Sequence, residues 1–258
     1  MKTFYVYSDL HLEFADSIPN NVLELFDIQS TETKDNKNYL MLAGDITNTT
    51  KISHYNNLFD YISPKFEKIF FIAGNHEYYG CTNISDTNSQ LSEICKKYKN
   101  VYFLNNSFYE LDDCIIVGST LWSDIDDSVK LNDFVCIKND STQFTHNEYK
   151  NLHLESVKYL NTILQNLKKP VIMLTHHFPT FEMIDPMYYK YKKLNTGFYS
   201  NLDYLIKNPI KYWISGHSHT TITKEYNNVH LICNALGYFT KFNCRENTKF
   251  IKFCKFII

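Results

Sequence analysis

The chain has 258 residues, of which 44% are hydrophobic and 21% charged, and its formal net charge is −2. This composition excludes a disordered chain, and the length is near the upper limit for one hydrophobic core, so we expect a single domain over residues 1–258. The near-neutral charge argues against a protein that holds nucleic acid by bulk electrostatics.

Arginine is almost absent from the chain. Of the 26 basic residues only Arg245 is an arginine, and the others are lysines. An anionic substrate therefore has to be held largely without the two-pronged guanidinium contact.

The cysteines and the amino terminus indicate where the protein works. Seven cysteines, an odd number without CxxC spacing, favour a reduced intracellular protein. The apolar amino terminus reaches Asp9 and His11 too soon for a signal peptide, and no apolar run approaches the ~20 residues of a membrane span. We therefore expect a soluble, cytoplasmic protein with no membrane contact.

The first half of the chain alternates short buried strands with polar connections. Apolar runs rich in β-branched and aromatic residues predict strands at 4–7, 39–42, 69–72 and 115–117. A helix is predicted over 87–97, because Thr87 and Gln90 have the spacing of a capping box.

The longest predicted helix opens the second half. It begins at Thr145, with Glu148 as the second member of a capping box, and carries apolar residues at helical spacing until Pro170 ends it. Further apolar runs predict strands at 171–174 and 212–214.

The carboxyl-terminal part has a different pattern. A short helix is predicted at about 201–207, and the pair Asn227-Asn228 joins 220–226 to 229–233 as a hairpin. Residues 249–257 are predicted to form a final strand. Together the elements predict a mixed α/β fold with a partly antiparallel end.

Polar side chains follow directly on five of the predicted strands. Because ligands of α/β proteins gather outside the carboxyl ends of the strands, all five segments can face one crevice. Six of the ten histidines lie in four of these segments. The segments are Asp9-Leu10-His11, Gly44-Asp45-Ile46-Thr47-Asn48, Gly74-Asn75-His76-Glu77, Thr175-His176-His177 and Gly216-His217-Ser218-His219.

The side chains in these segments are typical metal ligands. Asp-x-His and His-x-His place two ligands on one extended tip, where both can turn toward one ion. Imidazole, carboxylate and amide donors suit Mn²⁺, Fe or Zn²⁺ better than Ca²⁺, and no segment contains the thiolates of a structural zinc site. Taken alone, Asp-x-His is a weak signal and His217-Ser218-His219 could be a surface turn, whereas Gly-Asn-His-Glu after a strand is more specific. Five such segments in strand-end positions favour a metal site. The remaining histidines, His54, His146, His153 and His230, have no motif around them and are expected to be core or surface residues.

The five segments resemble the signature of the calcineurin-like metallophosphoesterases, from residue 8 to about 239. The resemblance implies a two-layered β-sandwich of mixed sheets flanked by helices, with two metal ions at the strand tips, Mn²⁺ being favoured over Fe or Zn²⁺. By the same resemblance Asp45 bridges both ions. Asp9, His11 and His219 would hold the first ion, and Asn75, His176 and His217 the second.

The resemblance also suggests roles for residues that do not bind metal. His76 would act as the catalytic residue near the leaving group, and Asn48 would orient neighbouring side chains. His177 would either contact a substrate phosphate or support the site, and Glu77 could orient His76; both questions stay open on the sequence alone.

The implied activity is hydrolysis of a phosphomonoester or phosphodiester. A hydroxide formed between the two metals would attack phosphorus, and the ions would supply the positive charge that arginines do not. The alternatives are a nuclease of the same superfamily and a non-enzymatic protein-binding scaffold of the same fold. A cysteine hydrolase is disfavoured, because no cysteine lies in a motif. We expect a small phosphorylated substrate and no stable nucleic-acid binding, and the sequence leaves the oligomeric state open.

Two long segments between strand tips, 119–146 and 178–199, are expected to wall the crevice. The second contains Tyr188-Tyr189-Lys190-Tyr191-Lys192-Lys193, in which aromatic rings alternate with lysines. This run would either stack on and neutralise a substrate or form a solvated cover.

Overall fold

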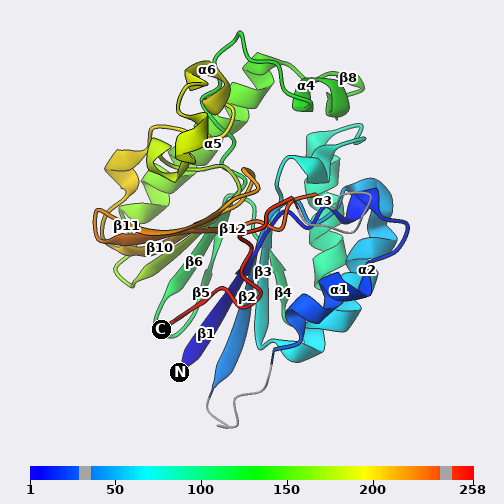
Figure 1. Cartoon of the computed structure of the whole chain (residues 1–258), viewed down its shortest axis with the longest axis vertical. Coiled ribbons are helices and arrows are strands. Elements are labelled where there is room, and N and C mark those ends of the chain that lie inside the picture. The colour runs from blue at the N-terminus through cyan, green and yellow to red at the C-terminus, as the bar shows by residue number, and fades with distance from the viewer. Residues whose placement is uncertain (29–35, 239–245) are drawn as a thin grey trace.

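The computed structural model describes residues 1–28, 36–238 and 246–258. Arg245 lies outside these residues. Two β-sheets pack face to face (Figure 1). Helices α1 (Asn20–Leu23), α2 (Ile52–Ile62) and α3 (Ile84–Lys96) lie beside the first sheet, and α5 (His146–Leu164) lies beside the second. The predicted sandwich of mixed sheets flanked by helices is confirmed.

The first sheet has five strands and is parallel except at one edge. Its order is β13-β1-β2-β3-β4, and only β13 runs antiparallel to its neighbour β1. The strands are continuous apolar runs because both faces of the sheet are covered. Their bounds are β1 (Lys2–Tyr7), β2 (Lys37–Ala43), β3 (Lys68–Ile72), β4 (Val101–Phe103) and β13 (Lys255–Ile257).

The second sheet has six strands in the order β11-β12-β10-β9-β6-β5. Its four central strands are parallel, and β5 and β11 close the edges antiparallel to their neighbours. The bounds are β5 (Ser107–Glu110), β6 (Ile115–Ser119), β9 (Val171–Thr175), β10 (Ile210–Ser215), β11 (Thr221–Tyr226) and β12 (Val229–Asn234).

A small separate ribbon and the helices complete the described chain. The ribbon pairs β7 (Lys138–Asn139) with β8 (Thr142–Gln143) and lies within the long connection between β6 and β9. The α-helices are α1 (Asn20–Leu23), α2 (Ile52–Ile62), α3 (Ile84–Lys96), α4 (Asp133–Cys136), α5 (His146–Leu164) and α6 (Lys192–Asn195).

The strand predictions hold better than the helix predictions. The six predicted buried strands and the second hairpin strand, 229–233, all lie within observed strands, and the hairpin forms with Asn227 and Asn228 both at positive φ, as a type I′ turn requires. Helix α2 was not predicted, although its buried residues have helical spacing. The final strand is shorter than predicted, because only residues 255–257 of 249–257 pair with β1.

Three helix predictions were wrong in their bounds. Helix α3 begins three residues before Thr87, because the Asn83 side chain caps it by accepting hydrogen bonds from two backbone amides. The capping box of Thr145 with Glu148 is confirmed, but α5 ends at Leu164, well before Pro170. The predicted helix at 201–207 is a single 3₁₀ turn over Asp203–Leu205.

Apolar side chains fill three layers. One cluster lies between the two sheets, with Val6 and Met41 from the first sheet facing Ile172 and Leu174 from the second. The other two clusters join each sheet to its own helices. This packing holds the two sheets together, so that the strand tips of both sheets meet at one edge. Within the described residues, no helix combines the length and apolar content that a membrane crossing requires.

Candidate metal centre

The five polar segments follow β1, β2, β3, β9 and β10, and the structure brings all of them together at one edge of the sandwich. The backbone is unusual at this edge. Asp9, Asp45 and His217 have φ values of 55°, 54° and 73°, and His11 and His219 have 47° and 46°. Positive φ is costly for side chains other than glycine, and such strain is concentrated at functional sites.

Gly74 shows why a glycine is needed beside these residues. A Cβ at this position would lie 2.2 Å from Asp45 Oδ1 and 2.6 Å from the His176 ring. Gly44, with φ +85°, also makes the tight turn into the site. The two glycines therefore let the strand tips approach closely enough to bring the polar side chains together.

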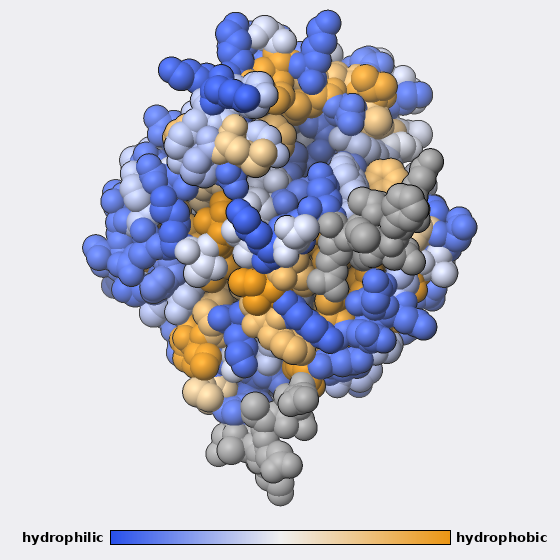
Figure 2. Space-filling model, viewed as in Figure 1, coloured by the Kyte–Doolittle hydropathy of each residue, from blue (hydrophilic) through white to orange (hydrophobic). Residues whose placement is uncertain are grey.

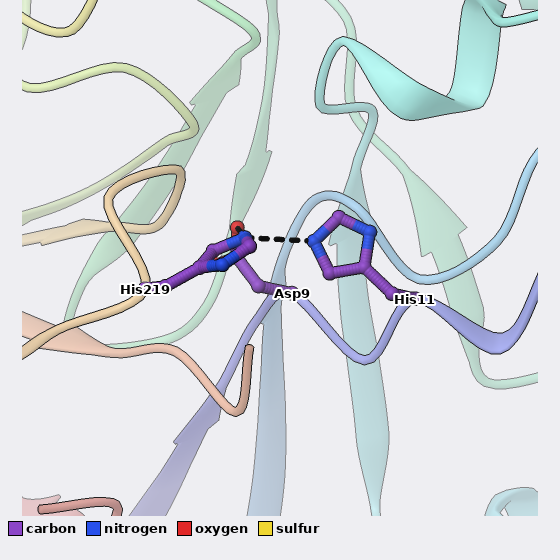
Figure 3. A group of neighbouring side chains, drawn as sticks. All are labelled: Asp9, His11 and His219. Carbon is purple, nitrogen blue, oxygen red and sulfur yellow. Dashed lines mark hydrogen bonds and ion pairs between the residues drawn. The ribbon is translucent and has the colours of Figure 1, made fainter. Parts of the chain in front are cut away.

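The first group of candidate ligands consists of Asp9, His11 and His219. The Nε2 atoms of His11 and His219 face each other at 2.8 Å, and His219 Nε2 lies 3.6 Å from Asp9 Oδ1 (Figure 3). One ligand atom from each of the three residues lies within 4.8 Å of the others. A single ion could be bound by all three.

The second group consists of Asn75, His176 and His217. His176 Nε2 lies 3.1 Å from Asn75 Oδ1, and the rings of His176 and His217 are 5.0 Å apart. Burial, followed by the nearby His177 and His176, holds the pKa of His217 well below its usual value. A neutral imidazole is the form that binds metal.

Asp45 connects the two groups. Its Oδ2 lies 3.3 Å from His176 Nε2 and 3.8 Å from His11 Nε2. Burial alone would raise its pKa, but the histidines His176 and His76 outweigh that effect and keep the pKa of Asp45 well below its usual value. Asp45 is therefore a buried carboxylate that faces both groups.

The hydrogen bonds at Nδ1 of the candidate histidines show whether these residues could hold metal ions. His11 Nδ1 lies 3.1 Å from Glu13 Oε1, His176 Nδ1 lies 2.7 Å from the Ala43 carbonyl, and His219 Nδ1 lies 2.6 Å from Glu246 Oε2. In all three, a carboxylate or carbonyl oxygen lies at hydrogen-bond distance from Nδ1, so Nε2 is the ring nitrogen that faces the other candidate ligands. Metal-binding histidines are oriented in this way. The ligand set therefore fits two divalent ions.

His76 lies beside the candidate ligands and lines the cavity. Its Nδ1 lies 2.7 Å from Glu13 Oε1, and its Nε2 is 3.3 Å from the Tyr238 hydroxyl. Burial acts to lower the pKa of His76, but Asp45 and Glu13 outweigh it and raise that pKa to about 9. The protonated form is therefore favoured. Sequence reasoning missed Glu13, although its spacing continues the Asp9-x-His11 alternation.

Glu77 supports the backbone of the site. Within the described residues, no hydrogen bond joins its carboxylate to His76. Its two carboxylate oxygens accept hydrogen bonds from the amides of Gly74, Asp45 and Ile46, at 2.6, 2.9 and 2.8 Å. The open possibility that Glu77 orients His76 is therefore not supported. Its carboxylate joins the tips of β2 and β3.

The structure favours the supporting role for His177. Its side chain is fully buried, with Nε2 3.0 Å from the Tyr149 hydroxyl and Nδ1 3.3 Å from the Thr120 carbonyl. Its ring packs 4.2 Å from the ring of His217. The Asn48 side chain accepts a hydrogen bond from the Thr50 hydroxyl at Oδ1, at 2.6 Å.

Asp133 was not found from the sequence, because nothing near it in the chain resembles a motif. It is buried in the inserted segment 119–146 and accepts hydrogen bonds from Asn75 Nδ2 at 2.7 Å and from the Tyr79 hydroxyl at 2.9 Å. This contact turns Asn75 so that its Oδ1 faces His176. Asp133 is therefore a positioning residue for the second ligand group.

We expect Asp133→Ala to weaken metal binding, because Asn75 would lose the partner that orients its amide. Loss of such a partner typically costs about 10–100-fold in metal affinity. Equilibrium titration with Mn²⁺ would measure this. Asp127→Ala in the same segment is the matched control, since Asp127 is exposed and pairs with Lys150. Equal Mn²⁺ affinity in both variants would show that Asp133 does not position Asn75.

The four histidines without motifs lie outside the ligand groups, as expected. His54 and His153 are buried, and His153 Nδ1 lies 3.0 Å from the Leu121 carbonyl. His146 stacks on Phe134, and His230 is exposed and stacks on Tyr212.

A cavity of about 320 Å³ opens beside the ligands. Both inserted segments line it, so the expectation that they wall the crevice is confirmed. The run of residues 188–193 contributes only Tyr188 to the lining, and its lysines lie elsewhere. The segment instead reaches the cavity mainly through Ile184, Leu194 and Phe198.

Comparisons with known proteins agree with this architecture. A family model described as calcineurin-like phosphoesterase matches residues 2–221. An uncharacterized protein of Acanthamoeba polyphaga mimivirus is 36% identical over 261 residues, which cover 92% of each chain.

Two solved structures share the fold. The phosphopantetheinyl hydrolase of Mycobacterium tuberculosis is similar with a TM-score of 0.71 and 16% identity, over 92% of this chain and 90% of that one. A Staphylococcus aureus protein with a suggested 5'-nucleotidase activity has a TM-score of 0.50 and 15% identity, over 90% of this chain and 48% of that one. At these identities the likeness establishes the fold alone.

Proposed function

Because this chain belongs to the calcineurin-like phosphoesterase family, we propose that it hydrolyses a small phosphoester at a dinuclear metal centre built on Asp45. That it is a hydrolase acting on phosphoester bonds follows from the family. The finer proposal concerns the ions, the role of each residue and the substrate.

One observation carries the dinuclear proposal: a single buried carboxylate, Asp45, faces two separate groups of ligand atoms. The orientation of His11, His176 and His219 supports it, because each has its Nδ1 occupied and its Nε2 turned inward. The ligand types favour Mn²⁺, with Fe and Zn²⁺ as alternatives.

Bound at these two groups, the ions would neutralise charge on the phosphoryl oxygens and lower the pKa of a water molecule. The chain itself supplies the proton for the leaving group. His76 lines the cavity and is held by Glu13 through Nδ1. The effect of burial is outweighed by Asp45 and Glu13, which raise the pKa of His76 to about 9, so a proton on its Nε2 could be given to the leaving oxygen. Glu77 and Asp133 keep the surrounding backbone and Asn75 in place.

We expect chelation to abolish phosphoesterase activity and Mn²⁺ to restore it, with about two ions bound per chain. Elemental analysis after Mn²⁺ saturation and gel filtration measures the ions. Thermal unfolding provides a second measurement, since a ligand that binds the native state raises the unfolding temperature. Protein that contains no metal after incubation with saturating Mn²⁺ and gel filtration would refute the proposal.

Two alternatives make different predictions. A non-enzymatic scaffold could lack activity while its metals remain bound, which the assay above would reveal. A nuclease would need a basic surface near the ions, whereas the cavity lining contains no lysine or arginine among the residues that the structure describes. The proposal therefore keeps a small substrate rather than a nucleic acid.

The proposal treats residues 1–258 as one domain, because the ligands come from the strand tips of both sheets. A reducing compartment such as the cytoplasm fits the free thiols of the six cysteines that lie within the described residues.

A further inference from the structure

The cavity beside the metal ligands has an apolar wall that the ligands do not need. Leu131 comes from the first inserted segment, and Ile184, Leu194 and Phe198 come from the second. Figure 2 shows apolar surface at the top of this face, near α4 and α6, beside a hollowed area. Such a wall adds nothing to the handling of a phosphoryl group, whose partners are polar.

Among the described residues, three carboxylates outside the candidate ligand groups line the cavity. Asp185 and Glu246 line it together with the ligands and Asp133. Glu246 pairs with His219, and Asp133 accepts from Asn75 and Tyr79, whereas the Asp185 carboxylate accepts a hydrogen bond only from the amide of Met187 within the described residues. A second negative charge on a substrate would therefore meet repulsion near this wall.

The lysines of the second inserted segment are directed elsewhere. Lys193 lies 3.9 Å from Asp126 and 3.3 Å from Ser128 Oγ, and Lys190 lies 4.9 Å from the ring of Tyr191. Within the described residues, no lysine or arginine lines the cavity. The only strong positive field that the proposed mechanism supplies there comes from the ions and His76.

We propose that the alcohol part of the substrate is an apolar or aromatic group without a second anionic group. This inference rests on the proposed function and specifies its substrate class. The phosphoryl group would occupy the ligand end of the cavity, and the alcohol would lie against Leu131, Ile184, Leu194 and Phe198. Burial of apolar surface favours such a group, while the acidic lining disfavours bisphosphates and phosphorylated carboxylic acids.

The test compares pairs of compounds that share the phosphorus group. Mn²⁺-loaded protein is assayed with benzyl phosphate and 2-carboxyethyl phosphate, and the corresponding phosphonates, which cannot be hydrolysed, are titrated by calorimetry. We expect kcat/KM for the benzyl ester, and the affinity for benzylphosphonate, to be higher by about tenfold or more.

A variant tests the wall itself. Leu194 is 44% exposed, so Leu194→Lys should fold, which thermal unfolding can verify. The new cation should reverse the preference, improving 2-carboxyethylphosphonate binding and weakening benzylphosphonate binding. Leu154→Lys is the matched control: Leu154 is 61% exposed on α5 and does not line the cavity, so its preference should equal that of wild type.

The outcomes separate the inference from the proposed function. Equal hydrolysis of the two esters and equal binding of the two phosphonates would overturn the inference and leave the proposed function intact. A Leu194→Lys preference unchanged from wild type would also overturn it. If neither ester is hydrolysed by the metal-loaded protein, the proposed function fails, and the phosphonate titrations still decide whether the cavity prefers apolar groups.

Discussion

Replacing Asp45 by asparagine should be the most damaging single change in this protein. We expect Asp45→Asn to lose at least about 10³-fold in activity, beyond the 10–100-fold loss typical of a residue that only orients a ligand. The reason is that Asp45 Oδ2 faces His176 and His11, so one substitution removes the negative charge shared by both ligand groups. Asparagine has nearly the same shape, which confines the change to charge and proton donation.

Metal content and activity should fall together in this variant. Elemental analysis should find fewer than about two ions per chain, and a steady-state assay should give the loss in kcat/KM. Asp112→Asn is the control, because it makes the same substitution at an exposed position outside the ligand groups. Asp45→Asn protein with two ions and undiminished activity would exclude Asp45 as the bridging residue.

His76→Asn should separate catalysis from metal binding. We expect kcat to fall by about 10²–10⁴-fold, the usual contribution of a positioned proton donor, while metal content stays near wild type. His76 contacts Glu13 and Tyr238 through its ring and belongs to neither of the two proposed ligand groups. His230→Asn is the matched control, since His230 is an exposed histidine on β12.

The leaving group gives a sharper test of His76. An alkyl alkoxide needs a proton as it leaves, whereas p-nitrophenolate is stable without one. His76→Asn should therefore impair hydrolysis of benzyl phosphate more than hydrolysis of p-nitrophenyl phosphate. Equal losses for both esters would argue that His76 stabilises charge without donating a proton. A large loss of bound metal would show instead that His76 maintains the ligand groups.

Local patterns in the sequence determined the strands and the positions of the candidate ligands. A buried strand has to be a short apolar run, so the segments around Phe4, Leu40 and Ile172 were identifiable from composition. Polar residues that follow such runs, as Asp9 and Asp45 do, lie at the carboxyl ends of parallel strands. The residues of the candidate site could be predicted from the sequence because they lie at strand tips.

Helix boundaries depended on details that periodicity does not contain. The start of α3 is set by the Asn83 side chain, which caps two amides, and not by the more recognisable Thr87 and Gln90. The turn at 203–205 was predicted as a longer helix, since a few apolar residues at suitable spacing do not ensure that a helix continues.

The roles of the supporting residues were decided by the tertiary structure alone. Glu77 is adjacent to His76 in sequence, yet it binds the amides of Gly74, Asp45 and Ile46. Asp133 lies 58 residues beyond Asn75 and still sets the orientation of that ligand.

The lining of the cavity was decided in the same way. The sequence left open whether the run 188–193 contacts a substrate or forms a solvated cover; in the structure Lys193 pairs with Asp126 outside the cavity, and Leu194 lines the cavity. The physical reason is that the local backbone decides where a side chain at a strand tip points. The partner of a side chain in an inserted segment depends instead on how segments distant in sequence pack together. The sequence by itself therefore identified the candidate ligands, and only the packing of the two sheets and their inserted segments decided which residues orient them and which surface lines the cavity beside them.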